Sequence, residues 1–191
     1  GFELDEIKRN LSEGQLALAT LLLTRIRNKS WDRLSARNRY RWHSLLADVE
    51  LRRGNAPAAA KLMIEGKDYQ PDDEDAVANE VVAYELLENH EKAAALCAAG
   101  CARFPNSGRL YASGMRVAAT VEEFEKLFRE RPDTLRDDPE VWIAAALRGG
   151  DAGERPEAEA RARRATELAP SDLRPWGALS FALMRSELRT V

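Results

Sequence analysis

The chain has 191 residues and a formal net charge of −3, and it is 45% hydrophobic and 32% charged. This length fits one domain or one compact repeat array, and the balance of apolar and charged residues excludes bulk disorder. Alanine occurs 31 times, whereas valine, isoleucine and threonine together occur 18 times. Such a composition excludes a β domain and favours helix throughout. The charge excludes a strongly basic nucleic-acid binder.

The hydrophobic periodicity predicts eleven helices, most of them separated by short turns. Pro71, Pro105, Pro132 and Pro170 are each followed by Asp, Asn, Ser or Thr. Proline cannot continue a helix, and the polar residues after it can cap the next one. The predicted helices span residues 3–12, 15–28, 36–53, 57–67, 73–88, 91–103, 108–119, 121–130, 139–149, 155–168 and 173–187.

Two connections and the two ends of the chain differ from the rest. The link at 118–121 is short, so we expect a tight turn there. The segment 149–156 reads Gly-Gly-Asp-Ala-Gly-Glu-Arg-Pro. Because it is long and rich in glycine, we expect a flexible loop there. The chain begins with Gly1 rather than Met, and we expect it to be a piece of a longer protein. We expect the helix at 173–187 either to cap the array or to continue into further repeats.

Two pairs of residues reveal an internal repeat. Pro71 and Pro105 are 34 residues apart, and so are Trp142 and Trp176. This is the length of the helix–turn–helix unit of the tetratricopeptide repeat. The chain resembles that family over essentially its whole length, with related helical-hairpin repeats as the alternative. The clearest unit has a large residue early in its first helix, small residues where the two helices cross, and a closing proline, namely Trp142, Ala146, Ala158, Ala165 and Pro170.

The resemblance implies an all-α, right-handed α-solenoid of about five and a half antiparallel helix hairpins. The hairpins have to stack because one hairpin cannot bury its own apolar face. The fourth unit is short, since Pro105 and Pro132 are only 27 residues apart, and the fifth is long, since Pro132 and Pro170 are 38 apart. The approximate units are residues 1–31, 36–71, 72–105, 106–132, 138–170 and 172–191, the last being partial or capping.

No pattern in the sequence predicts a catalytic, cofactor or metal site. The two histidines, His43 and His90, are far apart in sequence, which does not favour a nucleophile–histidine pair or a zinc site. We interpret Cys97 and Cys101 as small buried hydrophobic residues. The acidic run 72–75 lacks the spacing of a calcium loop and stands where it can stabilise a helix start. We therefore expect no enzymatic activity, no cofactor and no metal.

Arginine is concentrated in two places. Between residues 33 and 41, four arginines are followed or interrupted by aromatic residues, a pattern that can bind single-stranded nucleic acid. The negative net charge and the apolar stripe of the same helix disfavour nucleic acid as a partner, and this function stays an alternative. We interpret Arg161, Arg163 and Arg164 as surface charges near the C-terminus of a helix.

The resemblance also implies where a partner would bind, because the first helices of successive units line the concave face in that family. Asn79 stands where the family often holds a peptide backbone, and the arginines favour an acidic segment. Asp48 stands where some members have an asparagine that binds a carboxylate, so we do not expect that clamp. The candidate partner-binding residues are Arg41, Ser44 and Arg52 in the second unit, Asn79 and Val82 in the third, and Arg109, Ser113 and Arg116 in the fourth.

We therefore expect a non-catalytic protein–protein interaction module that docks a partner peptide or domain on its concave face, as a regulatory or recruiting part of a larger protein. The alternative is a structural scaffold or oligomer interface in an envelope or polysaccharide-export assembly, with self-association through the terminal repeats. No apolar run approaches the roughly 20 residues of a membrane-spanning helix. Free cysteines and no visible signal peptide favour a cytoplasmic location, or a periplasmic one if the longer chain carries a signal peptide.

Overall fold

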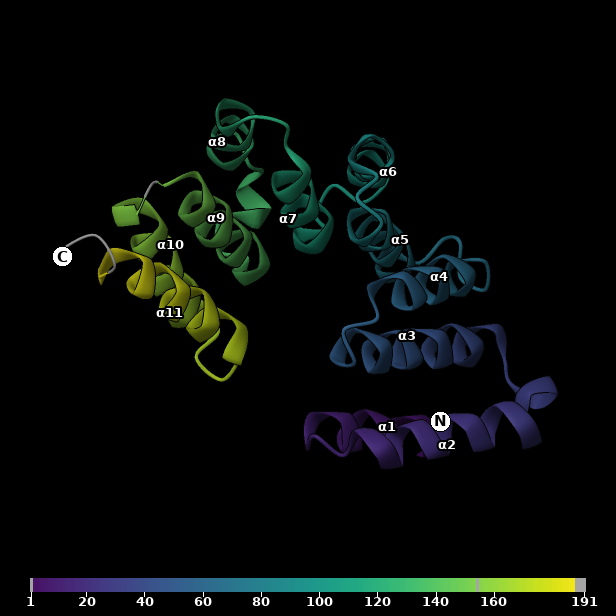
Figure 1. Ribbon diagram of the computed structural model, residues 1–191. Coiled ribbons are helices and arrows are strands. Elements are labelled where there is room, and N and C mark those ends of the chain that lie inside the picture. Colours follow the sequence, from purple (N-terminus) through teal and green to yellow (C-terminus); the bar gives the residue numbers. More distant parts are fainter. Residues whose placement is uncertain (1, 154, 188–191) are drawn as a thin grey trace. The chain divides into compact units, whose positions relative to one another are not determined.

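The computed structural model describes residues 2–153 and 155–187, which contain eleven α-helices, two short 3-10 helices and no strand (Figure 1). The predicted all-α fold is confirmed. The helices are α1 (Phe2–Ser12), α2 (Leu16–Lys29), η1 (Trp31–Arg33), α3 (Ala36–Arg52), α4 (Ala56–Lys67), α5 (Glu74–Leu86), α6 (His90–Arg103), α7 (Gly108–Val117), α8 (Val121–Arg129), η2 (Asp133–Leu135), α9 (Pro139–Ala152), α10 (Arg155–Leu168) and α11 (Leu173–Glu187).

The chain divides into two compact units, Gly1–Leu96 and Cys97–Val191. In the first unit, α1 packs on α2 and α3, α2 also packs on α3, and α4 packs on α3 and α5. In the second unit, α7 and α8 pack on each other and on α9, and α10 and α11 likewise pack on each other and on α9. Most of these helices thus contact the next helix of their unit, and several also contact the helix after that. This is the packing of stacked helical hairpins.

Polar side chains after the prolines begin several helices, as predicted. Two residues after Pro71, the Asp73 carboxylate accepts a hydrogen bond from the Ala76 amide at 3.1 Å. Two residues after Pro105, the Ser107 hydroxyl accepts one from the Leu110 amide at 3.2 Å. Each cap satisfies a backbone N–H that the first turn of a helix leaves without a partner.

The turn that follows the first helix of a hairpin recurs with the same geometry. The residue in the left-handed conformation is Gly14 after α1 (φ +77°), Gly54 after α3 (φ +75°) and Glu88 after α5 (φ +56°). Glycine adopts this conformation without steric cost, whereas glutamate does not. In all three turns the next amide bonds a carbonyl five residues back, from Gln15 to Asn10 (2.8 Å), from Asn55 to Glu50 (2.8 Å) and from Asn89 to Tyr84 (2.9 Å).

An aromatic cluster closes one end of the hairpins in the first unit. The rings of Trp31, Trp42, His43 and Tyr69 lie edge-on or tilted to one another, with centroids 5.1 to 6.1 Å apart. Trp42 is buried and donates its indole N–H to the Leu23 carbonyl at 2.9 Å, which ties α3 to α2. His43 is buried too, and its Nδ1 has no hydrogen-bond partner among the described residues.

In the second unit, alanines form the contacts between helices and aromatic residues fill the space beside them. Ala145, Ala162 and Ala165 are fully buried. Phe124 and Phe128, four residues apart on α8, pack into the core formed with α7 and α9. Phe128 meets the Trp142 ring edge-on with centroids 5.2 Å apart. Small residues thus let the helices approach one another closely.

The flexible loop predicted at 149–156 is wrong, because α9 continues to Ala152. Gly149 and Gly150 are buried inside the helix rather than exposed in a loop. A Cβ atom on Gly150 would lie 3.2 Å from the Phe181 ring, so this glycine serves close packing against α11. Gly153 has φ +87° and ends the helix, and Glu154 of the predicted loop lies outside the described residues.

The tight turn predicted at 118–121 is confirmed, since α7 ends at Val117 and α8 begins at Val121. Thr120 caps α8 by accepting a hydrogen bond from the Glu123 amide at 3.1 Å. The Glu123 carboxylate reaches back to accept one from the Ala119 amide at 2.9 Å. This near-reciprocal arrangement resembles a capping box and starts the shortened second helix of the fourth predicted unit.

Replacing Glu88 by glycine should stabilise the protein. The left-handed backbone costs a glutamate about 1 kcal/mol that glycine does not incur, so we expect Glu88→Gly to raise the free energy of unfolding by about that amount. Ala94→Gly, at an exposed position within α6, should lower it by about 1 kcal/mol. Urea denaturation followed by circular dichroism measures both changes. A loss of stability in Glu88→Gly would contradict the strain assigned to this turn.

Stability should fall in mild acid because of His43. Burial lowers the pKa of His43 below its ordinary value of 6.5, and the positive charge of Arg27 adds to this effect, against opposing contributions from Glu65 and the Leu62 backbone. The unfolded chain therefore binds a proton on His43 at a higher pH than the folded chain does. The free energy of unfolding should decrease as the pH falls from about 7.5 through 6.5 toward the folded pKa.

Urea unfolding at several pH values tests this expectation. The decrease should be smaller in His43→Phe, which keeps an aromatic ring in the cluster without a titratable group. His90→Asn is the matched control, because His90 is exposed, and it should retain the full decrease. Equal pH dependence in the wild-type chain and in His43→Phe would rule out His43 as its source.

Candidate functional site

In the first unit, side-chain bonds join the first helices of successive hairpins. Tyr40 and Arg41 are adjacent on α3, and one contacts a later helix of the chain while the other contacts an earlier one. The Arg41 guanidinium contacts the Asp5 carboxylate on α1, while the Tyr40 hydroxyl accepts a hydrogen bond from the Asn79 amide on α5 at 2.9 Å. The helices α1, α3 and α5 are therefore linked one to the next, and α3 and α5 carry five of the predicted partner-binding residues.

The candidates on α3 differ in exposure and in partners. Arg41 is half-buried and paired with Asp5, and Ser44 is half-buried and donates its hydroxyl to the Tyr40 carbonyl at 3.1 Å. Arg52 is exposed and forms an ion pair with Asp48 at 3.1 Å, one turn earlier on the same helix. Of these three side chains, Arg52 is the most open to a partner.

The candidates on α5 lie deeper. Asn79 is only 7% exposed, and its amide donates to Tyr40. Val82 is half-buried and packs against the cluster that contains Ala47 and Met63. Both side chains therefore contribute to packing between hairpins. The amide of Asn79, which the resemblance assigns to a partner's backbone, is engaged by a neighbouring helix.

The candidates in the second unit lie on α7. Arg109 is half-buried and Ser113 is fully buried. Arg116 is exposed and donates to the Ser113 hydroxyl at 2.7 Å, a contact within one helical turn. The structure thus brings Ser113 and Arg116 together, and Arg116 is the one that reaches the surface.

The paired carboxylates limit what these arginines can bind. The hydrogen bond from Arg41 lowers the pKa of the Asp5 carboxyl below its usual value, so Asp5 is ionised at neutral pH. An acidic partner would have to compete with Asp5 for Arg41 and with Asp48 for Arg52. Exposed pairs of this kind contribute little to stability, so a ligand that offers several carboxylates can compete for these arginines.

Two of the four arginines in the stretch 33–41 contact other side chains of the fold. The Arg39 guanidinium lies 5.5 Å from the ring centroid of Trp31 and 5.8 Å from that of Tyr69. Arg41 binds Asp5, which leaves Arg33 and Arg37 as the two exposed arginines of the stretch. Arginine and aromatic side chains here pack on one another, a cation–π arrangement that stabilises the cluster of the first unit.

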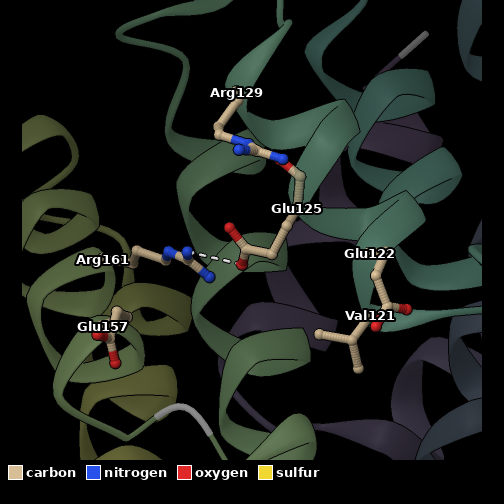
Figure 2. A pocket seen from close by; sticks show the side chains of 6 residues that line it. All are labelled: Val121, Glu122, Glu125, Arg129, Glu157 and Arg161. Atoms are coloured by element: carbon tan, nitrogen blue, oxygen red, sulfur yellow. Dashed lines mark hydrogen bonds and ion pairs between the residues drawn. The ribbon is translucent and has the colours of Figure 1, made fainter.

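A cleft that the sequence did not reveal lies between α8 and α10 (Figure 2). Its volume is about 420 Å³. Arg161 was interpreted as a surface charge, and this is wrong, because the residue is 8% exposed. Its guanidinium lies 2.7 Å from a Glu125 carboxylate oxygen and stacks over Phe128, with the ring centroid 4.7 Å away. The lining residues are Val121, Glu122, Glu125, Arg129, Glu157 and Arg161.

The cysteines lie on one face of α6, as their spacing predicts. Cys97 is buried and directs its Sγ toward the Leu110 carbonyl at 3.1 Å, whereas Cys101 is half-buried, with the two sulfur atoms 4.0 Å apart. Within the described ranges, no group of three or more His, Cys, Asp or Glu residues is placed to hold a metal ion. In that same part of the chain, every helix is too short or too polar to cross a membrane.

Comparisons with known proteins give a result at the level of the fold. No family model matches the chain, and none of the curated proteins matches it. Among solved structures, TTC0263, a thermophilic TPR protein of Thermus thermophilus, aligns with a TM-score of 0.71 and 21% identity over 95% of this chain and 97% of that one. MamA of AMB-1 aligns with a TM-score of 0.52 and 15% identity over 90% of this chain and 92% of that one. The chain is therefore built of helical hairpins with the fold of tetratricopeptide repeat proteins.

Proposed function

We propose that the chain is a non-catalytic protein-interaction module that docks a partner segment on the surface formed by the first helices of its hairpins. Such repeats present preformed surfaces that change little when a partner binds. In this role the chain recruits a partner to a larger protein or regulates that protein. The fold supports this general role, and within the first unit the side chains on α3 and α5 support the surface.

The observation that carries the proposal is a division among the candidate residues. Asn79 and Ser113 are buried, and the Asn79 amide donates to Tyr40 on the neighbouring first helix. Arg52 is exposed on α3 of the first unit, and Arg116 is exposed on α7 of the second unit. Exposed guanidinium groups on a rigid helix are suited to the carboxylates of an extended acidic segment. The preferred partner is therefore an acidic peptide or an acidic loop of a domain.

A second candidate function is self-association through α11. The structure leaves apolar side chains of this helix exposed, with Leu173 82%, Trp176 48% and Met184 60% accessible. Trp176 donates its indole N–H to the Pro170 carbonyl at 3.1 Å, which fixes the orientation of the ring. Exposed apolar residues on one helix favour an association surface, as expected for a scaffold or an oligomer interface.

Charge reversal tests the acidic-partner proposal. The probe is an acetylated and amidated peptide that contains Asp-Ser-Asp-Ser-Asp, titrated into the ¹⁵N-labelled chain. We expect the peptide to shift amide resonances on α3 and on α7. Arg52→Glu should weaken binding at α3 about tenfold, and Arg116→Glu should weaken binding at α7 by the same factor, because each change replaces an attraction by a repulsion. Arg163→Glu, an exposed arginine on α10, is the control and should bind as the wild type does. Equal weakening by all three variants would discard the assigned surface.

Light scattering over a range of concentrations tests self-association. We expect the wild-type chain to associate as its concentration rises and Trp176→Ser to weaken that association by about tenfold, since the indole is the largest exposed apolar group on α11. Leu87→Ser removes an exposed leucine elsewhere and should leave the association unchanged. A wild-type chain that stays monomeric throughout would eliminate the second candidate.

A further inference from the structure

The two cysteines of the chain form a pair that the proposed function does not use. Cys97 and Cys101 stand one turn apart on α6, so both face the same side of that helix. Their Sγ atoms lie 4.0 Å apart in a sulfur–sulfur hydrogen bond, so the two thiols are directed toward each other. Both residues belong to the second unit, as does α7, and the pair with its surroundings on α7 therefore lies within one unit.

The backbone of α7 encloses Cys97 from the opposite side. Cys97 is 3% exposed, and its thiol donates to the Leu110 carbonyl at 3.1 Å. A Cβ atom on Gly114, one turn after Leu110, would lie 3.3 Å from the Cys97 sulfur. Glycine at this position therefore leaves the sulfur space that a larger residue would occupy. Cys101 is half-buried, so the pair is shielded from water at Cys97 and open to solvent at Cys101.

The separation of the sulfur atoms does not suit a disulfide. A disulfide requires sulfur atoms about 2.05 Å apart and Cβ atoms about 3.5 to 4.5 Å apart. Side chains four residues apart on a helix have Cβ atoms about 5 to 6 Å apart. A bond between these two thiols would therefore draw the sulfur atoms about 2 Å closer and distort α6, which is one continuous helix from His90 to Arg103.

The same separation suits a single metal ion of low coordination number. A thiolate sulfur binds a first-row metal ion at about 2.3 Å. Two such bonds that enclose an angle of about 120° to 180° place the sulfur atoms about 4.0 to 4.6 Å apart. The Sγ atoms of Cys97 and Cys101 already stand at the lower end of this range. One ion can thus bridge the pair while α6 keeps its helical backbone.

The surroundings of the pair determine which ion fits. Zinc in proteins takes four ligands in a tetrahedron, drawn from Cys, His, Asp and Glu. Among the residues that the structure describes, no group of three or more of these types is placed to hold an ion. Two thiolates without further protein ligands favour a soft ion, and Cu(I) is a soft ion that thiolate ligands select. Such a centre requires no histidine, unlike the zinc site that the sequence disfavours.

We propose that Cys97 and Cys101 bind one Cu(I) ion between their sulfur atoms. Each thiol releases its proton to solvent and forms a sulfur–copper bond, and the oxidation state of the copper does not change. Cys97 gives up its hydrogen bond to the Leu110 carbonyl, so the ion replaces that proton at the contact between α6 and α7. Cys101, on the open side, provides the route of entry. The site is independent of the surface proposed for an acidic partner.

Competition with a coloured Cu(I) chelator tests the site. The reduced chain is titrated, in the absence of oxygen, into the copper complex of bicinchoninate, whose colour fades as the chain removes the ion. We expect one Cu(I) per chain, and shifts of amide resonances in 97–101 and 110–114 of the ¹⁵N-labelled chain. Zn²⁺, measured with a zinc indicator, should bind at least about tenfold more weakly, because the pair provides only two of its four ligands.

Variants of the two cysteines separate chelation from binding by a single thiol. Cys101→Ser, at a half-buried position, should weaken Cu(I) binding at least about tenfold, because one thiol remains. Cys97→Ala keeps a small apolar residue at the buried position and should weaken binding to the same extent. Met184→Leu removes an exposed thioether, another soft ligand, and is the control that should bind as the wild type does. Unchanged binding in Cys101→Ser, Zn²⁺ bound as tightly as Cu(I), or one copper per two chains would each overturn the proposal.

Discussion

The close approach of helix backbones is the constraint on which the rest of this structure depends. Ala59, Ala60 and Ala83 in the first unit, and Ala145 and Ala162 in the second, are fully buried where helices meet. A larger side chain at these positions would push the helices apart or force strained rotamers. Alanine at these positions is therefore a packing requirement. Aromatic residues such as Trp42 and Phe124 fill the spaces that small residues leave beside the crossings.

The sequence predicts the helices and their order well because local signals determine them. Asp73 and Ser107 follow prolines and cap helices, and no distant residue is needed for that inference. The predictions were wrong at positions where residues distant in sequence determine the environment of the side chain. Gly150 was assigned to a loop because glycine is permissive, yet it lies within α9, where a Cβ atom would come within 3.2 Å of the Phe181 ring on α11. Arg161 was assigned to the surface, but the approach of α8 buries it, and a helical period does not report distances between helices.

Some arginines of this chain stabilise the fold, and others are exposed to solvent. Arg39 packs on aromatic rings, Arg41 joins two helices, and Arg161 holds α10 to α8. Arg52 remains largely exposed. The net charge of −3 therefore does not predict the charge of any one surface, because some arginines are paired or buried within the fold and others are exposed. The candidate residues on the first helices were placed by resemblance, and only the structure separates those that anchor the helices from those that face solvent.

Glu88 occupies a turn position whose left-handed backbone conformation favours glycine. The turn after α5 has the left-handed residue and the five-residue-back hydrogen bond of the turns at Gly14 and Gly54. The hydrogen bond is common to the three turns, whereas the amino acid in the left-handed conformation is not. Backbone conformation therefore relates these three turns to one another better than residue identity does. An alignment that compared the units by backbone conformation would place Glu88 opposite the two glycines without a gap.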